Sequence, residues 1–109
     1  MRTAPSIADL VCRPRVTPET VIAEAGALVG LSATELLSRC RGRRHVVGRQ
    51  LAMYALRELT PLSYPEIAKI FNRDHTTVIA GVRRVRGAIA ASPDTADHIN
   101  QLITRLGQA

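Results

Sequence analysis

Residues 63–86, SYPEIAKIFNRDHTTVIAGVRRVR, predict two helices joined by a tight turn. Ser63 and Glu66 have the spacing of a capping box at the start of the first helix, which Asn72 ends. The second helix carries apolar residues at helical spacing on one face: Val78, Val82, Val85 and Ile89. The residues of its other face are polar or small: His75, Thr76, Ala80, Arg83, Arg84 and Arg86. This pattern is typical of a helix-turn-helix, whose second helix enters the major groove of DNA.

The start of the second helix carries groups that can read base edges. The hydroxyls of Thr76 and Thr77 and the imidazole of His75 can donate to base acceptors, and Asp74 can accept from a base amino group. Asp74 also stands where its side chain can cap the helix. Taken alone, these residues fit an ordinary helix N-terminus as well as they fit a DNA-reading one. The arginines that follow them favour a nucleic-acid function.

Positive charge is concentrated in the middle of the chain. The protein has 109 residues and a net charge of +6, but residues 39–86 hold eleven Arg or Lys against three carboxylates, a local charge of +8. Such a segment is the electrostatic footprint of a polyanion binder, although an anionic membrane would attract it as well. Fourteen of the fifteen basic residues are arginine, which suits phosphate and guanine contacts. Codon usage in a G·C-rich genome explains this preference equally well.

The rest of the chain predicts further helices. Those expected around the helix-turn-helix cover residues 18–29, a short segment from 32, residues 46–59 and a last segment from 93. In the short segment, Leu36 and Leu37 are expected to face inward. The sequence therefore predicts an all-α fold, a compact five- to six-helix bundle that contains a helix-turn-helix. We expect a flexible N-terminal arm at residues 1–16 and one DNA-binding domain at residues 17–107.

Two further groups of residues are candidates for contact with a phosphate strand. Four arginines occupy the polar run at 39–44, which is expected to be a loop: Arg39, Arg41, Arg43 and Arg44. Alone, such a run is more often a solvated linker, but beside a helix-turn-helix it favours DNA. The helix at 46–59 is expected to leave four residues on a face away from the core: Arg49, Gln50, Met53 and Arg57.

Several classes of protein are not expected. Cys12 and Cys40 lack the spacing of a zinc site, so we predict no metal and reduced thiols. The absence of a signal sequence and of an apolar run of about twenty residues predicts no membrane partner and a cytoplasmic, nucleoid-associated protein. No P-loop pattern occurs, so we expect no nucleotide partner. Asp74 and His75 have no assigned nucleophile beside them, so we predict neither an enzyme nor a cofactor.

Residues 49–78, RQLAMYALRELTPLSYPEIAKIFNRDHTTV, resemble the signature of the C-terminal DNA-binding domain (domain IV) of the bacterial chromosomal replication initiator DnaA. The resemblance extends more loosely from Val16 to Leu106. It implies a Trp-repressor-like helix-turn-helix fold and binding to double-stranded DNA at an A·T-rich box. Because the complete initiator joins such a domain to an ATPase module, the missing P-loop leads us to expect a freestanding DNA-binding protein.

The resemblance also implies roles for single residues. Family positions that contact bases match Asp74, His75 and Thr76, and the family's minor-groove arginine matches Arg41. Family positions that touch the sugar-phosphate backbone match Arg49, Gln50, Arg57, Tyr64 and Pro65. We expect six further residues to contact the DNA backbone as well: Arg43, Arg44, Arg73, Thr77, Arg83 and Arg84. Tyr64 departs from the leucine that is usual in the family.

We therefore expect sequence-specific binding at DnaA-box-like sites, which regulates replication initiation or transcription without ATPase activity. The alternative is a protein-binding adaptor that docks on the replication initiator or on another replication protein. Loss of function on changing Arg41 or His75 would favour the DNA hypothesis. Loss of function only on deleting residues 1–16 would favour the adaptor. The sequence leaves the exact DNA site, the oligomeric state and a bacterial or phage origin open.

Overall fold

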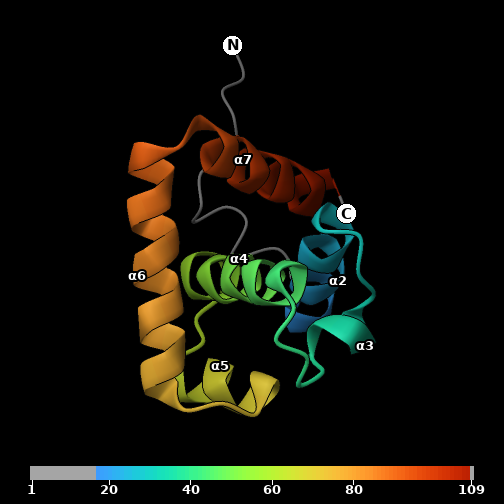
Figure 1. Ribbon diagram of the computed structural model, residues 1–109, viewed down its shortest axis with the longest axis vertical. Helices are drawn as coiled ribbons and strands as arrows, with labels where there is room; N and C mark the ends of the chain where they lie inside the picture. Colours follow the sequence, from blue (N-terminus) through green and yellow to red (C-terminus); the bar gives the residue numbers. More distant parts are fainter. Residues whose placement is uncertain (1–16, 109) are drawn as a thin grey trace.

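The computed structural model describes residues 17–108, and the predicted arm at residues 1–16 lies outside this range. The described residues form six helices and no strand, which confirms the predicted all-α class (Figure 1). The helices are α2 (Pro18–Leu28), α3 (Ala33–Leu36), α4 (Arg43–Leu59), α5 (Tyr64–Phe71), α6 (His75–Ala91) and α7 (Pro93–Gln108).

Helix α4 is the centre of the fold. It packs against every other helix of the described region. In Figure 1, α6 crosses one end of α4, and α2 and α3 lie at the other end. Helix α7 packs on α2 and α6 on one side of α4, whereas α5 lies on the opposite side. The helix-turn-helix formed by α5 and α6 is therefore supported along its inner side by α4.

Three helices begin where their capping residues predict. The hydroxyl of Thr17 accepts a hydrogen bond of 3.2 Å from the backbone N–H three residues later. Ser32 and Ser63 accept from the backbone N–H groups of Glu35 and Glu66 at 3.1 and 3.3 Å. The carboxylate of each glutamate in turn accepts from the N–H of its serine, so both predicted capping boxes are confirmed.

Helix α4 begins at Arg43, three residues before the predicted start at residue 46. Gly42 occupies the N-cap position with an extended backbone, and its carbonyl accepts a 3.0 Å bond from the N–H of Val46. Arginine is a good helix former, so nothing local stops the helix from extending back to Gly42. Arg43 and Arg44 therefore lie in the first turn of α4. The α3–α4 loop comprises residues 37–42 instead of the predicted 39–44.

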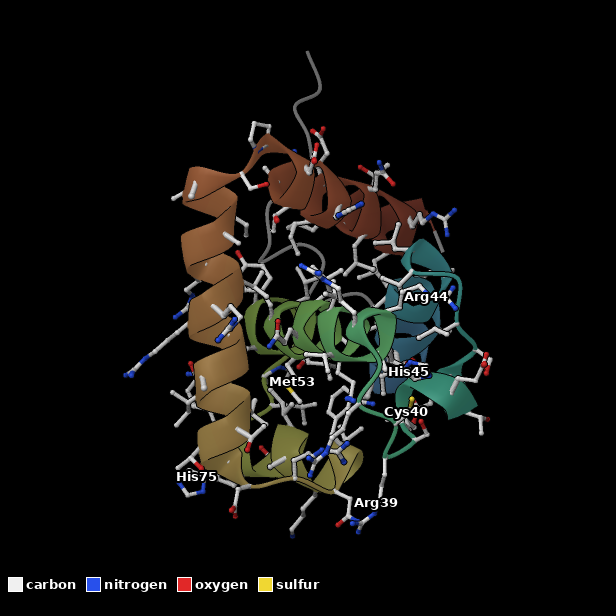
Figure 2. The ribbon with its side chains drawn as sticks, viewed as in Figure 1. Arg39, Cys40, Arg44, His45, Met53 and His75 are labelled. Atoms are coloured by element: carbon white, nitrogen blue, oxygen red, sulfur yellow. The ribbon has the colours of Figure 1, made fainter. Side chains whose placement is uncertain are left out.

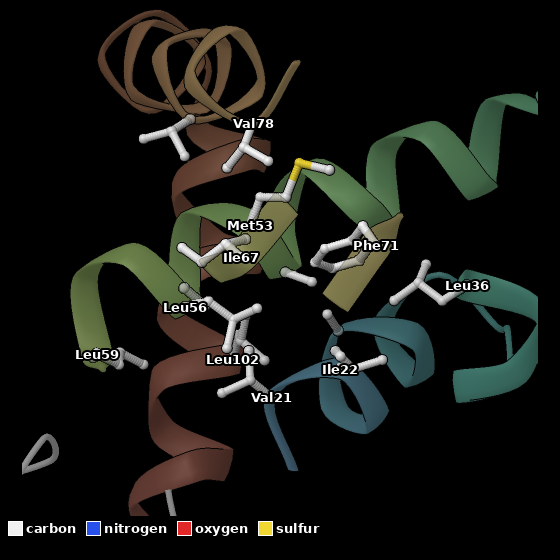
Figure 3. Close-up of a cluster of buried hydrophobic side chains, with 14 of the residues drawn as sticks. Val21, Ile22, Leu36, Met53, Leu56, Leu59, Ile67, Phe71, Val78 and Leu102 are labelled. Atoms are coloured by element: carbon white, nitrogen blue, oxygen red, sulfur yellow. The ribbon is translucent and has the colours of Figure 1, made fainter. Parts of the chain in front are cut away.

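The main core lies where the inner faces of the helices meet α4 (Figure 3). The predicted stripe of α6 is confirmed, since Val78, Val82 and Val85 are buried and Ile89 is partly buried. Met53 was expected on an outer face, but it is only 3% exposed and packs toward Val78. It belongs to the contact between α4 and α6, which the pattern of α4 alone does not reveal.

The two leucines that end α3 differ in burial. Leu36 is fully buried, as predicted. Leu37 is 37% exposed, so the prediction that it faces inward is wrong. Leu37 is the C-cap residue of a helix with only four residues, and the chain leaves the core there to enter the α3–α4 loop.

Candidate nucleic-acid interface

The turn between α5 and α6 is tight because Asn72 adopts a left-handed backbone with φ 53° and ψ 50°. Asparagine tolerates this conformation better than most residues with a side chain. The N–H of Arg73 then bonds to the carbonyl of Ala68 at 3.0 Å, and α6 begins at His75. The predicted helix-turn-helix is present at the predicted place.

Asp74 is the N-cap residue of α6, but its side chain makes no capping hydrogen bond. The expectation that the carboxylate caps the helix is therefore wrong. Its backbone carbonyl accepts from the N–H of Thr77 at 3.0 Å instead, which is enough to start the helix. The carboxylate itself is exposed and remains able to accept from a ligand.

The outer face of α6 is opposite its buried valines. Residues three and four positions apart lie on one side of a helix, so Thr76, Ala80 and Arg83 form one row. All three are exposed, as are His75, Thr77 and Arg84. Arg86, on the same helix, pairs with Glu58 at 2.8 Å, and this hydrogen bond raises the pKa of the Arg86 guanidinium. The base-reading and backbone candidates of α6 are thus accessible to a ligand.

A shallow hollow of about 260 Å³ lies beside the turn of the helix-turn-helix. Its lining joins residues of α5 to the start of α6: Pro65, Ala68, Lys69, Asn72, Arg73, Asp74 and His75. Lys69 is an exposed base that the sequence reasoning missed. It lies four residues after Pro65, so the two share one face of α5, and this spacing was the available signal.

The α3–α4 loop carries Arg39 and Arg41, and both are exposed. Figure 2 shows Arg39 and His75 at the same end of the molecule. Arg39 of the loop therefore lies at the end of the molecule where α6 begins. Arg43 and Arg44 are also exposed, and Arg44 donates to the carbonyl of Val29 at 3.4 Å.

Arg49 does not lie on an outer face, contrary to the prediction. It is only 6% exposed. Its guanidinium donates to the carbonyls of Leu36 at 3.1 Å and Ser38 at 2.9 Å, and also to the carbonyl of Cys40. Burial lowers the pKa of Arg49, and the nearby charge of Arg73 lowers it further. Arg49 therefore has a structural role, because its guanidinium is buried and its terminal nitrogens are bonded to backbone carbonyls and not free for a phosphate.

Arg73 is also engaged within the protein. It is partly buried and donates to the carbonyl of Phe71 at 2.8 Å and to that of Ser38 at 3.3 Å. Two arginines that were expected to contact the DNA backbone, Arg49 and Arg73, therefore meet at the same carbonyl of the α3–α4 loop.

The remaining backbone candidates lie along α4 and the start of α5. Arg57 is exposed, donates to the carbonyl of Leu62 at 3.2 Å and lies 4.5 Å from the ring centroid of Tyr64. A cation at that distance interacts with the aromatic face, so each side chain orients the other. Gln50 is partly buried at the contact with α6, where Arg84 lies beside it.

A metal-binding cluster and a membrane-spanning helix are both absent from the described residues. Within them, no group of three or more His, Cys, Asp or Glu side chains is arranged to hold a metal ion. None of the helices described is long and apolar enough to cross a membrane.

Comparisons with known proteins agree with this geometry. Residues 18–85 match the family model of the bacterial DnaA protein helix-turn-helix. The chromosomal replication initiator protein DnaA of Mycobacteroides abscessus is 34% identical over 111 aligned positions, which cover 94% of this chain and 23% of that protein. The corresponding protein of Cutibacterium acnes is 38% identical over 94 positions, covering 85% of this chain and 19% of that protein. The chain thus spans about a fifth of the length of these relatives.

Proposed function

The chain belongs to the family of bacterial DnaA helix-turn-helix domains, and on that premise we propose that it binds double-stranded DNA at A·T-rich, DnaA-box-like sites. In this proposal α6 enters the major groove, where Asp74, His75 and Thr76 read base edges. Arg41 enters the adjacent minor groove, whose narrow A·T-rich form concentrates negative potential.

The observation that carries the proposal is the exposed row of α6 together with the exposed arginines of the α3–α4 loop, of which Arg39 lies at the same end of the molecule as His75. Thr76, Ala80 and Arg83 have no core to pack against, because the valines of α6 fill that role. The polar side of α6 is therefore left for a ligand.

The charge at the start of α4 gives further support. Arg43 and Arg44 stand in its first turn, which contains no acidic residue. Positive side chains at the positive end of a helix dipole cost about 0.3–1 kcal/mol each. A bound phosphate would reverse this effect, since helix N-termini favour anions. The backbone contacts that we retain are Arg43, Arg44, Gln50, Arg57, Tyr64, Pro65, Thr77, Arg83 and Arg84.

We propose that occupation of such sites regulates replication initiation or transcription. The DNA sites themselves can be found by selecting random duplexes with the purified protein and sequencing the bound fraction. Enrichment of an A·T-rich box supports the proposal. A folded protein that enriches no sequence contradicts it and favours the alternative, an adaptor that docks on a replication protein.

A substitution pair tests which residues read sequence. His75→Ala removes a base-reading group and should cost roughly 1–3 kcal/mol on the enriched site, with little change on random DNA. Arg83→Ala is the matched control, because it removes an exposed charge from the same helix. It should weaken binding to both DNAs alike. Competition binding assays measure both effects, and equal losses on the two DNAs for His75→Ala would contradict base reading by α6.

A further inference from the structure

We propose that Arg49 and Arg73 are positioning residues, which together fix the α3–α4 loop and so set the spacing between Arg41 and α6. This inference rests on the proposed function, because it assigns a role to residues that are not themselves expected to touch bases. It replaces the expectation that both arginines contact the DNA backbone.

Arg49 holds the α3–α4 loop through hydrogen bonds. Its guanidinium donates to three carbonyls at alternate residues, those of Leu36, Ser38 and Cys40. Ser38 and Cys40 lie in the α3–α4 loop, which has no helix or strand of its own to satisfy their carbonyls, and Leu36 is the last residue of α3. A buried guanidinium needs such partners, since an unpaired buried charge is costly. Hydrogen bonds from a charged donor are stronger than those between neutral groups. The guanidinium of Arg49 therefore fixes the backbone path of residues 36–40.

Arg73 joins this loop to the helix-turn-helix. Arg73 lies in the turn immediately before α6, and it donates to the carbonyl of Phe71 at 2.8 Å and to that of Ser38 at 3.3 Å. The carbonyl of Ser38 therefore accepts from both Arg49 and Arg73. One loop atom thus connects α4, through Arg49, with the start of α6, through Arg73.

This connection places the loop that carries Arg41 relative to the start of α6. Arg41 lies three residues after Ser38, and His75 lies two residues after Arg73. Arg41 is thus close along the chain to the carbonyl of Ser38, and His75 is close along the chain to Arg73, which donates to that carbonyl. A loop that is ordered before binding avoids the conformational entropy that a mobile loop would lose on the DNA. Arg49 and Arg73 thus favour DNA sites whose minor-groove and major-groove contacts match one fixed spacing between Arg41 and α6.

Lysine substitution separates this role from phosphate contact. Arg73→Lys keeps the positive charge but loses the planar fork that can bond two carbonyls at once. Binding to the enriched site should weaken about tenfold, as expected if roughly one loop residue loses its order, while binding to random DNA changes little. Arg105→Lys is the matched control, because Arg105 is an exposed arginine on α7 that pairs with Glu24 at 3.0 Å. It should leave both affinities unchanged.

A double-mutant cycle tests whether Arg73 acts through Arg41. In the Arg41→Ala background the loss caused by Arg73→Lys should disappear, since the loop then has no reading group to position. Arg49→Lys should behave in the same way, with thermal unfolding measured alongside because Arg49 is buried. Equal fold losses in both backgrounds, or equal losses on both DNAs, would overturn the positioning role alone. If the unaltered protein prefers no sequence, the proposed function fails together with this inference.

Discussion

At the scale of single residues, the capping carboxylate of Glu66 makes the protein sensitive to acid. The backbone N–H of Ser63 donates to it at 2.8 Å; this bond first, and a side-chain bond with Ser63 second, lower the pKa of Glu66 below its ordinary value of 4.5. Because the folded-state pKa is the lower one, this contribution to stability is complete above pH 4.5 and is lost as pH falls through the folded-state pKa.

Glu66→Gln keeps an acceptor oxygen but cannot titrate there. The variant should have a smaller free energy of unfolding than the unaltered protein at about pH 7, and the difference should shrink by about pH 3. Denaturant unfolding at the two pH values measures it. A difference that does not depend on pH would show that the carboxylate charge plays no part in the cap.

At the scale of the helix, the same substitution should have opposite effects at two glycines. Gly87 lies on the exposed side of α6, and a Cβ there would meet nothing within 4 Å. Gly87→Ala should raise the free energy of unfolding by about 0.5–1 kcal/mol, because alanine loses less conformational entropy in a helix than glycine does.

Gly48 is the contrasting position. A Cβ there would lie 2.6 Å from Cδ1 of Leu36 and 2.9 Å from Cγ2 of Val29. Leu36 is fully buried, so Gly48→Ala should force it to shift within the core and destabilise the protein by about 1–2 kcal/mol through overpacking. Thermal unfolding of both variants compares the two. A stabilising Gly48→Ala would contradict the close approach of α4 to α3.

At the scale of the whole molecule, the concentration of basic residues determines how binding responds to salt. Most of the exposed bases lie on the α3–α4 loop, the start of α4, α5 and α6, with Arg57 near the end of α4 and Arg105 on α7. If about five to eight phosphates are neutralised, a plot of log K against log salt should have a slope of roughly −4 to −7. Fluorescence anisotropy titrations between low and physiological salt measure this slope. An affinity that does not depend on salt concentration would contradict a phosphate-contacting face.

The features that sequence reasoning predicted well are local. Both capping boxes involve residues three positions apart, and Asn72 ends α5 through its own backbone preference. The valine stripe of α6 follows from helical periodicity alone. In each case the signal and the structure that it produces lie within a few residues of one another.

The incorrect predictions concern contacts between distant segments. Met53 and Arg49 were expected on an outer face, but α6 covers the first and the α3–α4 loop covers the second. Helical periodicity gives the angle between two side chains on a helix. It does not say how much of the helix surface is covered by neighbouring segments. Since α4 has neighbours on most sides, its polar residues could not be assigned to solvent from sequence.

The sequence by itself determined the all-α class, the helix-turn-helix within residues 63–86 and the identity of the groups on the outer face of α6. These depend on caps, turn residues and periodicity, which act over one or two helical turns. Only the tertiary structure decided that Arg49 and Arg73 share the carbonyl of Ser38, although Arg73 lies 35 residues from Ser38. A hydrogen bond between segments so far apart exists only after packing on α4 has brought the loop and the turn together.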